Sequence, residues 1–324
     1  MNSMEAKKIY LDYAATTPVD PEVVEAMIQC LGPDGDYANS SSSHFFGKSA
    51  KVRIDTARGQ IAARIGAEVD SICFTSGATE SDNMALIGTM NANQHRGRHL
   101  ITSTLEHKAV LDTANALKDQ GFEVTFVDHD EHGVISTQQL ATAIRNDTVL
   151  VSIMHVNNET GVLQDLAVLG ELCRERGVLF HVDAAQSVGK VPLNVADFSV
   201  DLASLTAHKA YGPMGIGALY IRKGMKIAPM TYGGEQEWGY RSGTLATHQI
   251  AGFGKAFALA DPDQEGPLLA ARRDQLWAGL KVIEGVSLNG HATKRSPHIL
   301  NVTFAGVEGE SLRTSLADVA ISAG

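Results

Sequence analysis

A lysine and an aspartate each follow a short apolar run near the middle of the chain. Lys209 comes three residues after the run 202–206, and Asp183 ends the run GVLFHVD. If both runs are strands of one parallel sheet, the two side chains meet at the same edge. A lysine there can form a Schiff base with the aldehyde of pyridoxal phosphate, and an ionised aspartate can pair with the pyridine nitrogen. Taken singly, such residues are more often a solvated lysine and a helix-capping aspartate.

A second group of residues could hold a phosphate. The run SGATES, residues 76–81, joins a predicted strand to a predicted helix, and the free N–H groups of that helix start and the Thr79 hydroxyl suit an anion. The alternative is that Thr79 only caps the helix. The run YRSGT, residues 240–244, offers a further glycine with hydroxyl groups. No dinucleotide or Walker pattern occurs in the sequence, which argues against a nucleoside triphosphate site.

Three more polar residues follow predicted strands. His107 stands at a strand-to-helix junction, where it could stack on a cofactor ring or simply cap the helix. Asn158 lies in HVNNETG, and a polar amide after a buried strand must bind either backbone groups or a ligand. Gln186 follows Asp183 by three residues, on the same face of a helical turn. Both amides could reach the phenolic oxygen of the cofactor.

These side chains require a sheet whose strands end together. Short apolar runs alternate with amphipathic segments, which predicts an α/β fold with a mostly parallel, seven-stranded sheet covered by helices on both faces. The predicted strands are 71–75, 99–103, 122–127, 149–155, 178–182, 202–206 and 218–221. The predicted helices are 47–65, 79–91, 107–120, 137–144 and 165–176.

The pattern changes after residue 261, where Asp261-Pro262-Asp263 and Gly266-Pro267 interrupt the chain. We expect a large domain over residues 19–261. A smaller α/β domain would combine residues 1–18 with 262–324, with a helix over 268–283, strands over 286–288 and 299–304, and a further helix from 309. We expect this smaller domain to be cut short at its C-terminal end.

The composition excludes several classes of function. The chain has 324 residues, is 44% hydrophobic, and carries a formal net charge of -10, which argues against general binding of nucleic acid or anionic membranes. No apolar stretch reaches the roughly 18 residues of a membrane span, and the N-terminus lacks a signal-peptide core. Cys30, Cys73 and Cys173 show no metal-ligand spacing, so we expect no metal site and a cytoplasmic location.

Together the motifs resemble one family. They are LDYAATTPVDP, FTSGATESDN, TLEHKAVL, SIMHVNNETGV, HVDAAQSVGK, HKAYGPMGIGALY, RSGT and VEGESL, and they are similar to the cysteine desulfurases, pyridoxal phosphate enzymes of the class V aminotransferase group. The resemblance runs from about Ile9 to the last residue. It implies conversion of L-cysteine to L-alanine, with the sulfur passed as a persulfide for iron-sulfur cluster or thio-cofactor assembly. A sulfur-acceptor or iron-sulfur scaffold protein would be the partner.

The resemblance also implies roles for particular residues. Lys209 would be the Schiff-base lysine, Asp183 the pyridinium partner and His107 the ring that stacks on the cofactor. Asn158 and Gln186 would lie near the phenolic oxygen. The phosphate would be bound by residues of three separate segments, and the last of them would reach the phosphate of a neighbouring subunit in a homodimer. These phosphate residues are Ala78, Thr79, Thr206, His208 and Thr244.

The chain also departs from the family. Family members continue beyond ISAG into a loop with the nucleophilic cysteine, and a later arginine binds the substrate carboxylate. None of Cys30, Cys73 and Cys173 occupies that loop position. We therefore expect residues 1–324 to bind the cofactor and form carbanions without completing sulfur transfer. Two alternatives stay open: another class V lyase or aminotransferase that needs no cysteine, and a non-catalytic scaffold that binds the cofactor or an assembly partner.

Overall fold

The computed structural model of the protein describes residues 8–323. Within this range, seven strands form a central sheet in the order β2-β8-β7-β6-β5-β3-β4. β8 is antiparallel to both of its neighbours, and every other neighbouring pair is parallel. The strands are β2 (Ile72–Thr75), β3 (His99–Ser103), β4 (Glu123–Val127), β5 (Thr148–Ser152), β6 (Leu179–Asp183), β7 (Leu202–Thr206) and β8 (Gly217–Ile221). The predicted mostly parallel sheet of seven strands is confirmed.

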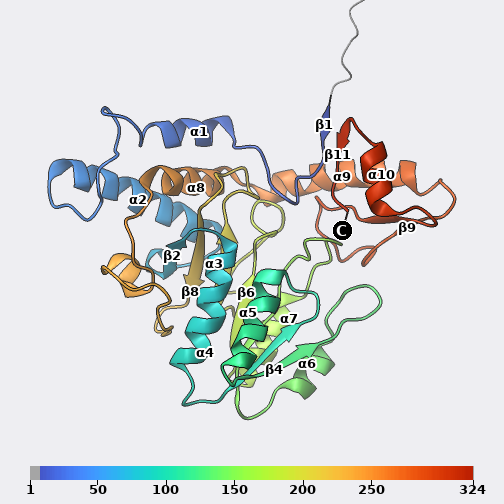
Figure 1. Ribbon diagram of the computed structural model, residues 1–324, viewed down its shortest axis with the longest axis horizontal. Coiled ribbons are helices and arrows are strands. Elements are labelled where there is room, and N and C mark those ends of the chain that lie inside the picture. Colours follow the sequence, from blue (N-terminus) through green and yellow to red (C-terminus); the bar gives the residue numbers. More distant parts are fainter. Residues whose placement is uncertain (1–7, 324) are drawn as a thin grey trace, which may run out of the picture.

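Helices cover both faces of the sheet (Figure 1). One face shares an apolar core with α2 (Phe45–Arg64), α6 (Thr137–Ala143), α7 (Leu166–Glu175) and α8 (Thr247–Leu259). The other face packs on α3 (Ala78–Asn83), a π-helical turn η2 (Met84–Gly88), α4 (Thr89–Ala92) and α5 (Lys108–Asp119). Neighbouring strand residues point to opposite faces. Because Phe180 and Val182 of β6 belong to the first core, His181 and Asp183 face α3 and α5.

The remaining elements lie at one end of the sheet. α1 (Pro21–Ile28) packs on α8. At the side of the molecule where the chain ends in Figure 1, α9 (Pro262–Leu280) precedes an antiparallel pair, β9 (Val286–Leu288) and β10 (Val302–Phe304). α10 (Gly309–Ser315) follows, and β1 (Ile9–Tyr10) pairs in parallel with β11 (Val319–Ala320). Two short helical turns, η1 (Val69–Ser71) and η3 (Gln236–Gly239), complete the described elements.

We call α9, β9, β10, α10 and the β1–β11 pair the end unit. A short β-bridge joins this end unit to the segment that follows β5 of the central sheet. Val162 and Arg295 form an antiparallel pair, Leu163 N donates to Lys294 O at 3.0 Å, and Ser296 N donates to Gly161 O at 2.7 Å. The segment that follows β5 is therefore held by residues of the end unit.

Several predicted boundaries are wrong by three residues or more. Strand β5 ends at Ser152 instead of residue 155, because the Glu106 carboxylate accepts the Met154 N–H at 2.9 Å and ends the pairing with β3, although backbone hydrogen bonds to β6 continue. Helix α9 begins at Pro262 instead of residue 268. The supposed interruption is its cap, since Asp261 accepts from the N–H groups at 263 and 264 and a proline suits the first helical position. Strand β10 begins at Val302 instead of residue 299.

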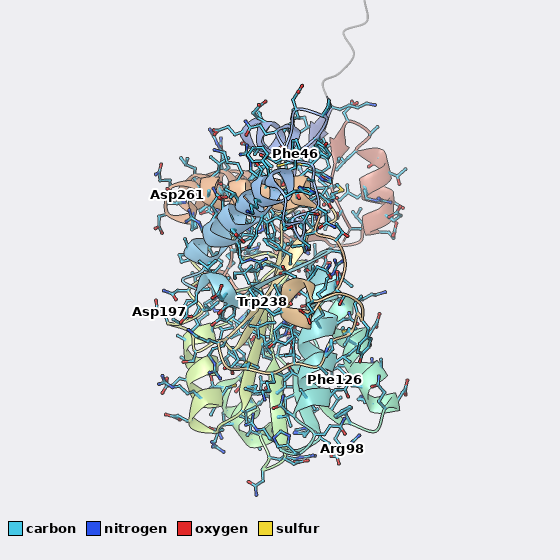
Figure 2. The ribbon with its side chains drawn as sticks, turned by 90° about the vertical axis from the view of Figure 1, so that its left-hand side faces the viewer. Phe46, Arg98, Phe126, Asp197, Trp238 and Asp261 are labelled. Atoms are coloured by element: carbon cyan, nitrogen blue, oxygen red, sulfur yellow. The ribbon has the colours of Figure 1, made fainter. Side chains whose placement is uncertain are left out.

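The surface carries several large apolar side chains near α2 and η3. Tyr232 is 83% exposed, Phe45 77%, Phe46 55% and Trp238 52%. Figure 2 shows Phe46 at the start of α2 and Trp238 on η3, with Phe46 above Trp238 in that view. No helix in the part of the chain that the structure describes is long and apolar enough to cross a lipid bilayer.

Candidate active site

Lys209 and Asp183 come together at the carboxyl edge of the sheet. Strands β6 and β7 are parallel neighbours, with Asp183 paired opposite Ser204. Lys209 follows the end of β7 by three residues. Asp183 is 5% exposed and Lys209 is half-buried, and each lies close enough to perturb the pKa of the other. The ligand site of such a sheet lies beyond these strand ends.

Burial sets the charge balance of the pair. It raises the pKa of Asp183, while the Ala185 N–H at 2.9 Å, Lys209 and His107 all act in the opposite direction. Burial lowers the pKa of Lys209, and Asp183, Asp82 and Glu159 oppose that shift. A lysine whose pKa is lowered presents more of the free amine, which is the form that attacks a carbonyl carbon.

The start of α3 leaves an open space at Gly77. Gly77 is the N-cap and no side chain caps the helix, so the hypothesis that Thr79 merely caps it is wrong. A Cβ built on Gly77 meets no atom within 4 Å. At Gly217, opposite Thr206 in the ladder, a Cβ would lie 2.6 Å from the Gly77 Cα. Glycine at 217 therefore lets the start of β8 approach the helix start where Ala78 and the exposed Thr79 lie.

The N-terminal segment holds the loop that carries Lys209. The carbonyl of His208 accepts from Thr17 N at 2.9 Å and from Thr17 Oγ1 at 2.8 Å. The His208 Nδ1 lies 3.2 Å from Thr16 Oγ1, and Tyr211 N donates to Thr17 Oγ1 at 2.8 Å. Residues far apart in sequence thus fix the backbone on both sides of the lysine.

His107 caps helix α5, as the simpler of the two hypotheses for this residue predicts. Its Nδ1 accepts the Ala109 N–H at 3.1 Å, and the ring is exposed. The ring nevertheless acts on Asp183, whose pKa it lowers. Capping and stacking on a ligand are compatible here, because the cap uses only one ring nitrogen.

The two predicted amides lie in different surroundings. Gln186 is buried, donates to Ala14 O at 2.8 Å and has its oxygen 3.3 Å from His298 Nε2. Asn158 is half-buried and donates to the Glu159 carboxylate at 2.7 Å. Its neighbour Asn157 binds the backbone of the turn, so the capping alternative applies to Asn157.

Thr244 lies on the segment between β8 and α8 and is exposed. Arg241, three residues before it, donates to Glu80 at the start of α3 at 2.9 Å. Glu80 also accepts the Ser76 N–H at 2.5 Å. The RSGT segment of this chain is thereby tied to its own helix α3, with Thr244 exposed at its end.

Sequence reasoning missed two buried carboxyl groups under the site. Glu106 accepts from Ser103 Oγ at 2.7 Å and from Met154 N, and burial raises its pKa to about 8. Asp82 is 1% exposed on α3. The sequence does contain a signal for Asp82, because an acid on the buried face of a predicted helix is uncommon.

The cysteines do not take part. Cys30, Cys73 and Cys173 are each 1% exposed. Burial raises the pKa of all three thiols, that of Cys173 to about 12. None of them presents the accessible thiolate that a nucleophile needs.

The comparison with known proteins agrees with this arrangement. The family model of class-V aminotransferases matches residues 9–324. The cysteine desulfurase IscS of Photorhabdus laumondii is 54% identical over 98% of this chain and 80% of its own length. The chain belongs to the cysteine desulfurases of the class-V aminotransferase family. IscS of Klebsiella pneumoniae is 53% identical over the same shares of the two chains.

Solved structures of other proteins share the fold. A NifS-like protein superposes with a TM-score of 0.90 at 36% identity, covering 96% of this chain and 85% of its own. The protein described as SspA in complex with cysteine gives a TM-score of 0.87 at 38% identity, over 97% of this chain and 88% of its own. The fold class predicted from the sequence is therefore also that of these two solved structures.

Proposed function

We propose that this cysteine desulfurase binds pyridoxal phosphate between Lys209 and Asp183 and converts L-cysteine to L-alanine, releasing the sulfur to a thiol for iron-sulfur cluster or thio-cofactor assembly. The observation that carries the proposal is the position of the two residues at the ends of neighbouring parallel strands, β6 and β7. Relatives named cysteine desulfurase at 53–54% identity support the choice of reaction.

The residues present fit this cofactor. Lys209 offers an amine of lowered pKa, Asp183 offers a buried acid, and the space before Gly77 is open for a phosphate. The free N–H groups of a helix start suit an anion. When bound, the cofactor supplies an electron sink for the electron pair left on the substrate α-carbon. Ala78, Thr79, Thr206 and His208 would bind its phosphate.

Lys209, Asp183 and the side chains around them would have separate roles in the reaction. Lys209 is the base that would take the proton from the substrate α-carbon and return a proton to the product, because burial lowers its pKa and makes the free amine more available. Asp183 would hold a proton on the pyridine nitrogen. His107 would cover one face of the ring, and Asn158 and Gln186 would orient the phenolic oxygen.

The sulfur step needs a thiolate. In that step the thiolate forms an S–S bond with the substrate sulfur, the C–S bond breaks, and its electron pair stays with the substrate carbon, which is then protonated. Because Cys30, Cys73 and Cys173 are buried with raised pKa values, the accepting thiolate is a different thiol. A sulfur-acceptor or scaffold protein is the expected final recipient.

A homodimer would complete each site. Thr244 is exposed and would reach the phosphate bound by the partner subunit, and the exposed Tyr232 and Trp238 on the same segment supply apolar surface for the contact. Apolar patches on a surface commonly mark such interfaces.

Product analysis tests the proposal. The protein loaded with pyridoxal phosphate is incubated with L-cysteine and a small thiol as acceptor, and alanine and sulfide are quantified. We expect equimolar alanine and sulfide from the wild-type chain and neither from Lys209→Ala. A keto acid product would favour an aminotransferase. Cofactor absorbance without any turnover, in a sample supplied with the thiol, would favour a non-catalytic scaffold.

A further inference from the structure

Asp82 is a buried acid that lacks every partner an ionised carboxylate requires. It projects from α3 toward the sheet and is 1% exposed. No hydrogen-bond partner among residues 8–323 reaches either of its carboxyl oxygens. The nearest basic atom is His181 Nε2, 3.6 Å from Oδ1. An unpartnered carboxylate in such surroundings would cost several kcal/mol, so the neutral acid is favoured.

His181 does not supply the missing positive charge. Its Nδ1 lies 2.8 Å from Ser152 Oγ and its Nε2 lies 3.0 Å from Ser204 Oγ. Both hydroxyl groups can donate or accept, so they satisfy a neutral ring with one N–H and one lone pair. Burial lowers the pKa of His181 to about 3. Ser152, His181 and Ser204 thus form an uncharged hydrogen-bonded row across three strands, and Asp82 lies against it.

The charged groups that face Asp82 from the neighbouring elements are mostly acidic. Asp183 follows His181 by two residues on the same face of β6, and Glu106 comes from the segment after β3. Burial, then the repulsion by Asp183, raises the pKa of Asp82, and Glu106 acts in the same direction. The Ser204 hydroxyl and Lys209 act in the opposite direction without cancelling the effect of burial. One cation cannot neutralise three carboxylates, so the acids compete and the least solvated ones keep their protons.

We propose that Asp82 is a protonated carboxylic acid, which leaves Asp183 as the single anion at the floor of the site. The inference rests on the proposed function, because it concerns how Asp183 pairs with the pyridine nitrogen. A second negative charge at position 82 would raise the proton affinity of Asp183. The proton would then move from the ring nitrogen to the carboxylate, and the electron sink would be weakened.

Infrared difference spectroscopy measures the protonation state directly. Spectra at about pH 7 are compared between wild type, Asp82→Asn and the exposed surface control Asp112→Asn, each with and without pyridoxal phosphate. We expect the wild type to show a C=O stretching band of a protonated carboxyl group that Asp82→Asn lacks and Asp112→Asn retains. Glu106→Gln identifies the band of the other buried acid. Identical carboxyl bands in wild type and Asp82→Asn would overturn the proposal.

A titration of the bound cofactor tests the link to Asp183. The visible absorbance of the cofactor-loaded protein is followed against pH. Asp82→Asn keeps a neutral polar group, so the midpoint should move by less than about 0.3 pH units. If Asp82 were ionised, its removal would lower the midpoint by about one unit or more, which would overturn the proposal. A wild-type sample that shows no absorbance change on cofactor addition contradicts the proposed function instead, and the infrared result still decides the charge of Asp82.

Discussion

Arg58 and Glu237 form a bidentate ion pair that is nearly closed to water. Arg58 Nη2 lies 2.6 Å from Glu237 Oε1 and Nη1 lies 2.8 Å from Oε2, with side-chain exposures of 8% and 2%. The guanidinium carbon stands 4.5 Å from the ring centroid of Phe74 and 4.8 Å from that of Trp238. The Phe74 N–H also donates to the Glu237 carboxylate at 2.6 Å. The pair therefore ties η3 to both α2 and β2.

Removing one partner of this pair should be costly. Glu237→Gln leaves the Arg58 charge buried without its counterion, and such changes typically cost about 3–5 kcal/mol of the free energy of unfolding. Chemical denaturation measures the loss, with Glu235→Gln, an exposed neighbour, as the matched control. Glu237 and Trp238 both have positive φ, 48° and 54°. This backbone conformation is unfavourable for residues other than glycine, so the ion pair between Arg58 and Glu237 must hold it in place. A loss no larger than that of the control would contradict this role.

Borohydride should fix the cofactor to Lys209. Reduction of the loaded protein converts the reversible bond between lysine and aldehyde into a stable one, and peptide mass spectrometry locates the label. We expect the label on the peptide that contains Lys209, with no fixation in Lys209→Ala. Lys223→Ala, which removes an exposed lysine, should label as the wild type does. Fixation on another lysine in the wild-type chain, with none on Lys209, would refute the assignment.

Asp183→Asn should bind the cofactor and yet exchange the substrate α-proton slowly. The amide keeps the shape of the side chain but cannot hold the pyridine nitrogen protonated. Loss of one such electrostatic partner commonly costs on the order of a hundredfold or more in rate. Exchange into deuterated solvent, followed by NMR on a bound amino acid, gives the rate. The exposed Asp197→Asn serves as control, and near-normal exchange in Asp183→Asn would rule the role out.

A shared site predicts complementation between two defective chains. A Lys209→Ala chain and a Thr244→Ala chain are mixed under conditions that exchange subunits. In the heterodimer, one site then carries both defects and the other carries neither. In the isolated heterodimer, half of the sites should therefore show wild-type cofactor affinity and turnover. If mixing restores neither cofactor affinity nor turnover at any site, the homodimer proposal is contradicted.

The buried acid Glu106 predicts a specific pH dependence of stability. Burial raises its pKa to about 8 from an ordinary value of 4.5. The protonated form is favoured in the folded state, so its contribution is fully present below pH 4.5 and is lost as the pH rises through about 8. Relative to Glu106→Gln, the wild type should lose up to about 1.4 kcal/mol per pH unit in this window. A stability difference that does not change with pH would contradict it.

The sequence predicted those parts of the fold that follow from periodicity and strand ends. The alternation of apolar runs and amphipathic segments predicted the sheet. The positions of Asp183 at the end of β6 and of Lys209 just after β7 predicted correctly that the two residues lie together. The residue-level roles around them stay predictions. Boundaries were wrong where a tertiary contact decides them, as at Met154, whose N–H goes to Glu106 instead of continuing the ladder of β5.

Other parts could not be read from the sequence because they depend on distant partners. Gln186 was predicted near a cofactor oxygen, and nothing local indicated that it binds Ala14 and approaches His298. Glu237 is 179 residues from Arg58, so neither residue type nor spacing indicates that pair. The proposed charge state of Asp82 rests on the lack of a hydrogen bond to either carboxyl oxygen among the described residues, which only the packed structure reveals.

The hydrogen bonds from Thr17 to the His208 carbonyl determine how early the site can form while the chain is being synthesised. The two residues are 191 positions apart, and a ribosome adds roughly 5–20 residues per second. The N-terminal segment therefore waits roughly 10–40 s for its partner to be translated. The loop that carries Lys209 cannot reach its final shape before then. The site that would receive the cofactor is thus completed only after the segment around His208 has been made and has met the segment around Thr17.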